Sequence, residues 1–160
     1  MASELNEVIN MMEQNAIRFE QVTGYHDAIM PMRKTADSAG YDLHAYYSES
    51  IQPGEIKFIE TGIKCKLPRG KYLQLHLRSS VGTKFAGMML ANGTGIIDAD
   101  YYNNPDNEGH IMIPLLNLGT KPFNIKCADR LAQLIVMDYV TTTDDNATGT
   151  RMWGFGSTGK

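Results

Sequence analysis

The sequence predicts an all-β fold, a jelly-roll-like antiparallel barrel with a short N-terminal helix and a flexible C-terminal arm. Short stretches of alternating or apolar residues, separated by turn residues, run through most of the 160-residue chain. Helical spacing is confined to the N-terminus, and glycine is concentrated in the last twelve residues. Many short strands without interleaved helices are typical of closed or sandwiched antiparallel sheets. We expect a single β domain over residues 1–148 and a mobile glycine-rich arm over residues 149–160.

The opening segment is predicted to form an amphipathic helix over residues 3–14. Its apolar positions recur at helical spacing and are Leu5, Val8, Ile9 and Met12. Ser3 is placed to cap the first turn, where Glu4 is also favourable. Because a helix this short is marginal alone, we expect its apolar stripe to pack against the protein body or a neighbouring subunit.

Strand patterns begin after this helix. The predicted strands are residues 17–22, 56–59, 72–77, 111–118 and 131–136. Turn residues such as Pro53-Gly54 and Pro68-Arg69-Gly70 separate them. The segment 88–98 is predicted to be a hairpin, because its apolar arms surround Asn92-Gly93, a pair that tolerates positive φ.

Composition excludes several classes of protein. A formal net charge of -3 and a pI of about 5.8 argue against direct binding of nucleic acid through its phosphates. The two cysteines form no CxxC motif and the four histidines show no ligand spacing, so we expect no structural zinc. We also expect no export signal and no membrane span, and therefore a cytoplasmic protein.

The last twelve residues combine phosphate ligands with a nearly structureless backbone. Four of the 15 glycines lie there, which raises the cost of ordering the segment until something organises it. Arg151, Ser157 and Thr158 can bind phosphate, and Phe155 offers a flat apolar face. These residues favour a lid over a nucleotide, and the alternative is a plain disordered end. Residues 154–160 match most of a P-loop, but the hydroxyl residue and helix that should follow are lacking, so we expect no P-loop NTPase.

A second chemical signal follows the predicted hairpin. In an extended segment, Asp98 and Asp100 share one face and Tyr101 lies on the other. The bland interpretation is an ordinary turn beside a strand aromatic that packs in the core. The sharper one is a carboxylate next to an aromatic ring in a ligand site.

Together with the tail, this segment completes a set of five motifs that resembles the homotrimeric dUTP pyrophosphatases (dUTPases), which have a β-clip fold. The motifs are AGYDL (39–43), RSS (78–80), GIIDADY (95–101), DRLAQLI (129–135) and GFGSTG (154–159). Each is weak alone, but five in the family's order are specific, and they leave only the N-terminal helix uncovered. The resemblance implies hydrolysis of dUTP to dUMP and pyrophosphate, which keeps uracil out of DNA and supplies dUMP for dTMP synthesis.

The resemblance also implies roles for individual residues. Asp98 matches the carboxylate that activates water for attack on the α-phosphorus and holds the sugar 3′-hydroxyl. Tyr101 matches the ring under the deoxyribose, where a ribose 2′-hydroxyl would lose its water without gaining a partner. The residues matched to uracil recognition are Asn92, Met112 and the backbone of Gly95, Ile96 and Ile97.

Phosphate contacts are implied in three motifs. The matching residues are Arg78, Ser79, Ser80 and Gln133, with Arg151, Ser157 and Thr158 at the γ-phosphate and Phe155 stacked on uracil. Asp42 resembles a carboxylate that orients the water shell of Mg²⁺, an ion that the substrate triphosphate and waters would hold. The family pattern implies a homotrimer whose sites are shared between subunits and closed by a neighbour's arm.

Departures from the pattern leave alternatives open. Ser80 replaces a glycine of the second motif, and RSS also occurs in the related dCTP deaminases, although those need a glutamate where Pro114 stands. Met152-Trp153 brings Arg151 closer to Phe155 than usual, which leaves the partner of Arg151 open. The alternatives are a dCTP deaminase or bifunctional relative, and a trimeric dUTP-responsive regulatory protein. Residues 102–109, longer than the family's turn, would then be the contact surface of the regulatory protein.

Overall fold

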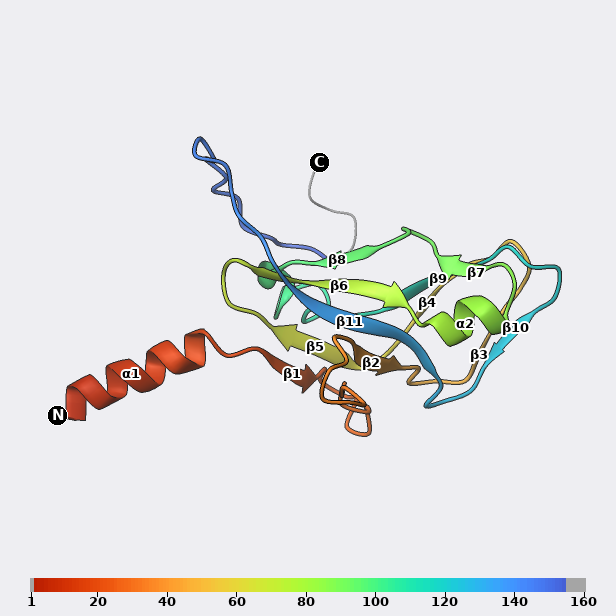
Figure 1. Ribbon diagram of the computed structural model, residues 1–160, viewed down its shortest axis with the longest axis horizontal. Helices are drawn as coiled ribbons and strands as arrows, with labels where there is room; N and C mark the ends of the chain where they lie inside the picture. The colour runs from red at the N-terminus through yellow and green to blue at the C-terminus, as the bar shows by residue number, and fades with distance from the viewer. Residues whose placement is uncertain (1, 155–160) are drawn as a thin grey trace.

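The computed structural model describes residues 2–154 and shows a body of short strands (Figure 1). The helical elements are α1 (Ala2–Gln14), α2 (Ser79–Lys84) and the 3-10 turn η1 (Ala99–Tyr101). The strands are β1 (Arg18–Gln21), β2 (Tyr41–His44), β3 (Glu49–Ile51), β4 (Ile56–Ile59), β5 (Ile63–Lys66), β6 (Lys71–Leu77), β7 (Met88–Leu90), β8 (Gly95–Ile97), β9 (Ile113–Asn117), β10 (Phe123–Ile125) and β11 (Arg130–Asp138).

The strands form four antiparallel sheets. The largest has the order β2-β11-β6-β8, and a second has the order β4-β9-β7. Two smaller sheets pair β1 with β5 and β10 with β3. This arrangement confirms the predicted all-β, jelly-roll-like fold with a short N-terminal helix.

The core lies between the sheets and is mostly aliphatic at its centre. Side chains that are at most 1% exposed include Leu43, Leu73, Leu75 and Leu134 of the large sheet and Ile51, Ile59, Ile63, Ile113 and Leu115 of the others. Burying one such side chain stabilises the fold by about 1.5–3 kcal/mol. Because strand residues alternate between faces, Gln74 and His76 of β6 lie on the opposite, outer face of the large sheet.

Most predicted strands are confirmed to within a few residues. Residues 56–59 coincide with β4, and 72–77 and 131–136 lie within β6 and β11. Several shorter strands, and α2, were not predicted. The sequence patterns therefore predicted the strands with the strongest alternation, including the four-residue β1 and β4, and missed other short strands such as β2, β3, β5 and β10.

The predicted hairpin over 88–98 is wrong in its pairing. The turn exists, since the amide of Gly93 donates to the carbonyl of Leu90 at 3.0 Å and Gly93 has φ of 71°. However, β7 pairs with β9 and β8 pairs with β6, so the arms belong to different sheets. Each arm is only three residues long, and burial against a different sheet outweighs the local preference of the Asn-Gly turn.

Helix α1 confirms the predicted helix but not its packing on the body. The side chains of its apolar stripe are 44–70% exposed, and α1 extends away from the strands (Figure 1). Packing of α1 against a neighbouring subunit stays a prediction. Within residues 2–154, the helices are too short and too polar to cross a membrane.

Candidate active site

Asp98 lies at the junction of β8 and η1. Its backbone is extended, with φ of -76° and ψ of 159°, and the 3-10 turn begins at the next residue. This turn replaces the expected extended segment but gives a similar result: Tyr101 points inward and is 4% exposed, whereas Asp98 and Asp100 lie at the surface with side chains 49% and 55% exposed. The sheet therefore fixes the backbone of Asp98 while solvent reaches its carboxylate.

Arg151 of the arm joins the two carboxylates. Its Nη2 donates to Oδ2 of Asp98 at 2.5 Å, and its Nε donates to Oδ1 of Asp100 at 2.8 Å. The guanidinium also lies 5.7 Å from the centre of the Tyr101 ring, within the range of a cation–π contact. In this structure the partners of Arg151, left open by the sequence, are thus residues of the third motif in its own chain.

The Tyr101 phenol is held from two sides. Its hydroxyl donates to the carbonyl of His110 at 2.9 Å and accepts from Nδ2 of Asn107 at 2.8 Å. Burial raises the pKa of Tyr101, so the phenol stays protonated at neutral pH and can donate. His110 is itself fixed, because its Nε2 accepts from the amide of Gly62 at 2.9 Å, and burial lowers the pKa of its ring.

An open groove of about 580 Å³ runs beside the two carboxylates. Its walls are Leu67, Arg69, Asp98, Ala99, Asp100, Tyr139, Thr141, Asp145 and Ala147. These residues come from the turn before β6, from η1 and from the segment after β11. The segment after β11 projects from the body and returns toward β8, which places Arg151 over η1 (Figure 1).

A second charged cluster surrounds Asp42 of β2. Asp42 is 6% exposed, and its two carboxylate oxygens pair with Nε of Arg78 at 3.0 Å and Nη1 of Arg130 at 3.1 Å. Arg78 directly precedes α2, so Ser79 and Ser80 form the first turn of this short helix. The cluster therefore joins the first, second and fourth motifs.

Gln133 lies on the same outer sheet face as this cluster. It is opposite Asp42 on β2 and opposite His76 on β6, and residues in register across antiparallel strands share a face. A Cβ at Gly40 would overlap with Oε1 of Gln133. The glycine of the first motif thus makes room for the glutamine of the fourth.

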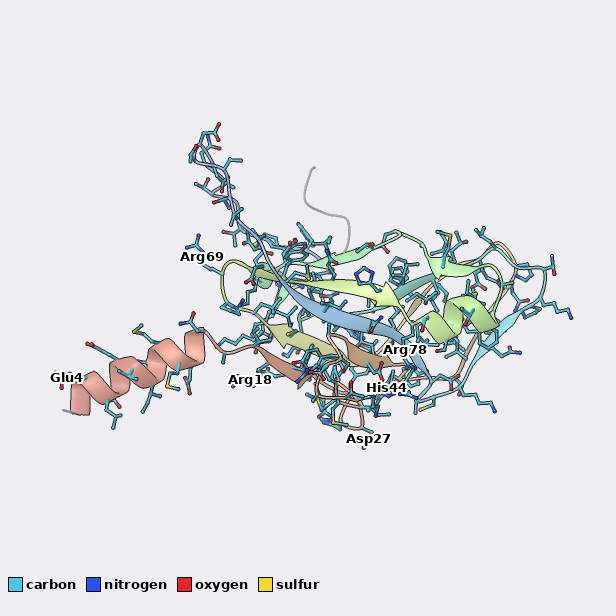
Figure 2. The ribbon with its side chains drawn as sticks, viewed as in Figure 1. Glu4, Arg18, Asp27, His44, Arg69 and Arg78 are labelled. Atoms are coloured by element: carbon cyan, nitrogen blue, oxygen red, sulfur yellow. The ribbon has the colours of Figure 1, made fainter. Side chains whose placement is uncertain are left out.

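The two clusters lie at opposite ends of β6. Ile97 pairs with Leu73 near the start of β6, so Asp98 lies at that end, whereas Arg78 follows the last residue of β6. Five to six residues of strand separate them, which corresponds to about 17–20 Å. Figure 2 shows Arg69, which shares the groove with Asp98, and Arg78 at the two ends. A single chain does not bring the two sets of predicted residues together.

The remaining predicted site residues are not members of these two clusters. Asn92 is exposed in the turn before β8, and Met112 immediately precedes β9. Phe155, Ser157 and Thr158 lie outside the described residues. Sequence reasoning did not assign roles to Asp100, Arg130, Asn107 and His110, although Asp100 and Arg130 were visible within the third and fourth motifs.

Comparison with known proteins decides the family, since the dUTPase family model matches residues 26–159. The chain belongs to the dUTPase family. It is 42% identical over 145 residues to the deoxyuridine 5'-triphosphate nucleotidohydrolase of Lactococcus lactis subsp. lactis (strain IL1403), covering 88% of this chain and 96% of that protein. The family inferred from the five motifs is therefore confirmed, and the chain is an enzyme that hydrolyses dUTP to dUMP.

Solved structures agree with this assignment. The dUTPase of Streptococcus mutans superposes with a TM-score of 0.74 at 38% identity, over 78% of this chain and 97% of that one. A mutant dUTPase from phage phi11 of S. aureus has a TM-score of 0.68 over 84% of this chain and 98% of that one. At 21% identity, the second likeness is one of fold alone.

Proposed function

We propose that Asp98 is the general base of dUTP hydrolysis. A water oxygen attacks the α-phosphorus, its proton passes to Asp98, and the bond from the α-phosphorus to the bridging oxygen breaks, so that the electron pair leaves with pyrophosphate. The observation that supports this role is the position of Asp98, which is fixed by the end of β8 while its carboxylate is half exposed beside a groove. A general base needs both properties, because it must reach water and a fixed substrate.

Tyr101 is proposed to recognise the deoxyribose. Its ring follows Asp98 by three residues, and its hydroxyl is bonded on both sides, so the ring cannot rotate away from the site. A ribose 2′-hydroxyl against this ring would lose its water without a partner, at a cost of about 1–3 kcal/mol. Since Arg151 now lies over the ring, the nucleotide would displace it toward the phosphates, which is the predicted role of Arg151.

Uracil recognition is proposed for the backbone of β8, with Asn92 and Met112 beside it. The backbone groups of an extended segment can complement the acceptor-donor-acceptor edge of uracil, and a cytosine would leave a buried mismatch. The arm over residues 149–160 is proposed to close over this site, with Phe155 on the base and Ser157 and Thr158 at the γ-phosphate. Closure would exclude bulk water from the triphosphate.

A homotrimer with shared sites is the proposed assembly, and the geometry of one chain supports the sharing of sites between subunits. Asp98 and Arg78 of one chain lie about 17–20 Å apart along β6, which is much longer than a triphosphate. The phosphate contacts predicted for Arg78, Ser79, Ser80 and Gln133 would therefore come from a different subunit than Asp98. Asp42, with both oxygens paired to arginines, is suited to orient Arg78 for this task.

Mg²⁺ is proposed to enter with the substrate as Mg·dUTP. Among residues 2–154, no three His, Cys, Asp or Glu side chains are grouped to hold a metal ion. Few protein ligands are needed by an ion that keeps several waters and is bound mainly by phosphate oxygens. The phi11 dUTPase coordinates a structural Mg(II) ion. When bound, Mg²⁺ would neutralise part of the triphosphate charge, while the predicted water-mediated contact to Asp42 would compete with its arginine partners.

The decisive experiment compares Asp98→Asn with Asp100→Asn. Both substitutions remove a negative charge that faces Arg151, but only the first removes the proposed base. We expect kcat for Mg·dUTP to fall about 100- to 10,000-fold in Asp98→Asn, the range for loss of general-base catalysis, and far less in Asp100→Asn. Equal losses in both variants would show that the negative charge facing Arg151, rather than a base, is what matters.

Substrate selectivity tests the remaining roles. Pyrophosphate release is expected from dUTP and to be negligible from UTP, dCTP and dTTP. Comparable turnover of UTP would contradict the role of Tyr101, and release of ammonia from dCTP would favour the deaminase alternative. The regulatory alternative stays a prediction, which a partner retained by Asp98→Asn and lost on deletion of residues 102–109 would support.

A further inference from the structure

The loop over residues 102–109 has a specified conformation. The side chain of Asn104 is buried, and its Nδ2 donates to the carbonyl of Tyr101 and to Oδ1 of Asn107, both at 2.8 Å. Its Oδ1 accepts from the amides of Asp106 and Asn107, both at 3.1 Å. One asparagine thus folds the loop back onto Tyr101.

The loop is also fastened to β5. Nζ of Lys64 donates to Oδ1 of Asn103 at 2.8 Å and pairs with Oε2 of Glu108 at 3.2 Å. Asn103 and Glu108 both have positive φ, which bulky residues rarely adopt. Backbone strain of this kind persists only where surrounding contacts enforce it.

Asn107 connects the loop to the Tyr101 phenol. Its Oδ1 accepts from Asn104 and from the amide of Gly109 at 3.0 Å, which fixes the orientation of the amide group. Its Nδ2 therefore faces Tyr101 and donates to the hydroxyl at 2.8 Å. The hydroxyl donates its own hydrogen bond to the carbonyl of His110, so Asn107 and His110 together hold the phenol.

The neighbouring residue, Asp106, receives the arm. Its Oδ2 accepts from the amide of Gly154 at 3.1 Å. Gly154 is buried, and a Cβ there would lie 2.8 Å from Oδ2 of Asp106 and 3.1 Å from Nδ2 of Asn107. Only glycine lets the arm approach this closely without displacing the two loop side chains.

We propose that the 102–109 loop is a positioning element that couples sugar recognition to docking of the arm. Asn107 is the positioning residue for Tyr101, and Asp106 seats the arm at Gly154. This inference rests on the proposed role of Tyr101 in sugar recognition. The loop then serves catalysis through contacts within the enzyme, rather than as the contact surface of a regulatory protein.

A double-mutant cycle tests the link from Asn107 to Tyr101. The variants are Asn107→Ala, Tyr101→Phe and the double variant, and each is assayed for kcat and KM with dUTP and UTP. Both single substitutions remove the hydrogen bond between Asn107 and Tyr101, and Tyr101→Phe also removes the one to the carbonyl of His110. Each should lower the ratio of kcat/KM for dUTP over UTP about 3- to 10-fold. The double variant should lower it no further than Tyr101→Phe alone, because the effect of Asn107 passes through the hydroxyl that this variant already lacks.

Tyr102→Phe is the matched control for this cycle. It also removes one hydroxyl from the loop, but that hydroxyl donates to Oε2 of Glu20 at 2.7 Å, away from Tyr101. Its selectivity ratio should stay at the wild-type value. If Asn107→Ala does not fold, Asn107→Asp is the substitute, because it keeps the shape and the Oδ1 acceptor while losing the Nδ2 donor.

Trp153, the single tryptophan of the chain, reports the docking of the arm. Trp153 is already 62% exposed, so the mobility of its side chain is the readout. Asp106→Ala should release Gly154, so the anisotropy of Trp153 fluorescence should decrease and KM for dUTP should rise. Tyr102→Phe should leave the anisotropy unchanged. Unchanged anisotropy in Asp106→Ala would overturn the seating of the arm on the loop.

The outcomes separate this inference from the proposed function. Additive losses in the double variant, or an unchanged ratio in Asn107→Ala while Tyr101→Ala alters it, would overturn the positioning role and leave Tyr101 as the sugar contact. An unchanged ratio in Tyr101→Ala itself would instead remove Tyr101 from sugar recognition.

Discussion

The two aspartate–arginine clusters at the ends of β6 are built in different ways. Asp42 is buried, and its partners Arg78 and Arg130 are fixed at or beside regular elements. Asp98 is half exposed, and its partner Arg151 belongs to the arm. Breaking the first cluster disturbs the sheet, whereas breaking the second requires only movement of the arm. The difference indicates that the Asp42 cluster is rigid, which suits the proposed holding of phosphates. The Asp98 cluster can exchange its arginine partner, which suits the proposed chemistry.

Mixed trimers give the largest expected effect. Asp98→Asn and Arg78→Ala chains would be co-expressed with different tags and purified through both. If the proposed homotrimer forms, one site of three in each mixed trimer combines an intact Asp98 with an intact Arg78. Activity should recover from almost nothing to about a third of wild type if the two ends of β6 serve sites shared between subunits. No recovery in verified mixed trimers would mean that each chain completes its own site.

Removal of the arm should abolish most turnover without unfolding the body. Truncation after Thr148 removes Arg151 and the predicted phosphate ligands, so kcat/KM should fall about 100-fold or more, as expected for lost phosphate-stabilising donors. The unfolding midpoint should change little, because the partly exposed ion pairs of Arg151 contribute about 1 kcal/mol or less each. Enzyme assays and denaturation curves at equal protein concentration measure both. Loss of the oligomer would show that the arm is structural.

Asp42→Asn should affect stability where Asp98→Asn affects catalysis. Removing the buried charge leaves two guanidinium groups without their carboxylate, which should lower the free energy of unfolding by about 2–3 kcal/mol per chain. Asp98→Asn, whose side chain is half exposed, should change it by less than about 1 kcal/mol. Urea denaturation of both variants checks this contrast, and equal destabilisation would show that the two clusters are not different in kind.

Acidification should slightly lower the free energy of unfolding. Burial lowers the pKa of His110 and of His44, whereas both titrate near 6.5 in the unfolded chain. As pH falls below 6.5 the unfolded state binds more protons, so the free energy of unfolding decreases until the lowered folded pKa is reached. The slope should not exceed about 1.4 kcal/mol per pH unit for each histidine. Denaturation between pH 7 and 5 measures it, and His110→Gln, which keeps an acceptor, should show a smaller slope.

The sequence patterns predicted the fold correctly where local preference for an element and burial of its residues favour the same structure. The alternation in 56–59 and 72–77 reflects one face in the core, and the helical spacing of 3–14 produced a helix even though its apolar stripe is 44–70% exposed. The patterns failed for α2, whose six residues include Gly82 and Thr83 and whose N-cap makes no side-chain capping bond. Such a helix depends on the burial of Val81 rather than on its own propensity.

The candidate site also has features that the sequence predicted and features that it did not. The sequence by itself determined the family, the third-motif carboxylate and the aromatic ring, because each motif is a short run of neighbouring residues that can be recognised without the fold. Only the tertiary structure decided that the arms of 88–98 enter different sheets, that Arg151 bridges Asp98 and Asp100, and that Asn107 clamps Tyr101. Such contacts depend on which surfaces compete for burial and on which donors and acceptors meet once the chain has folded.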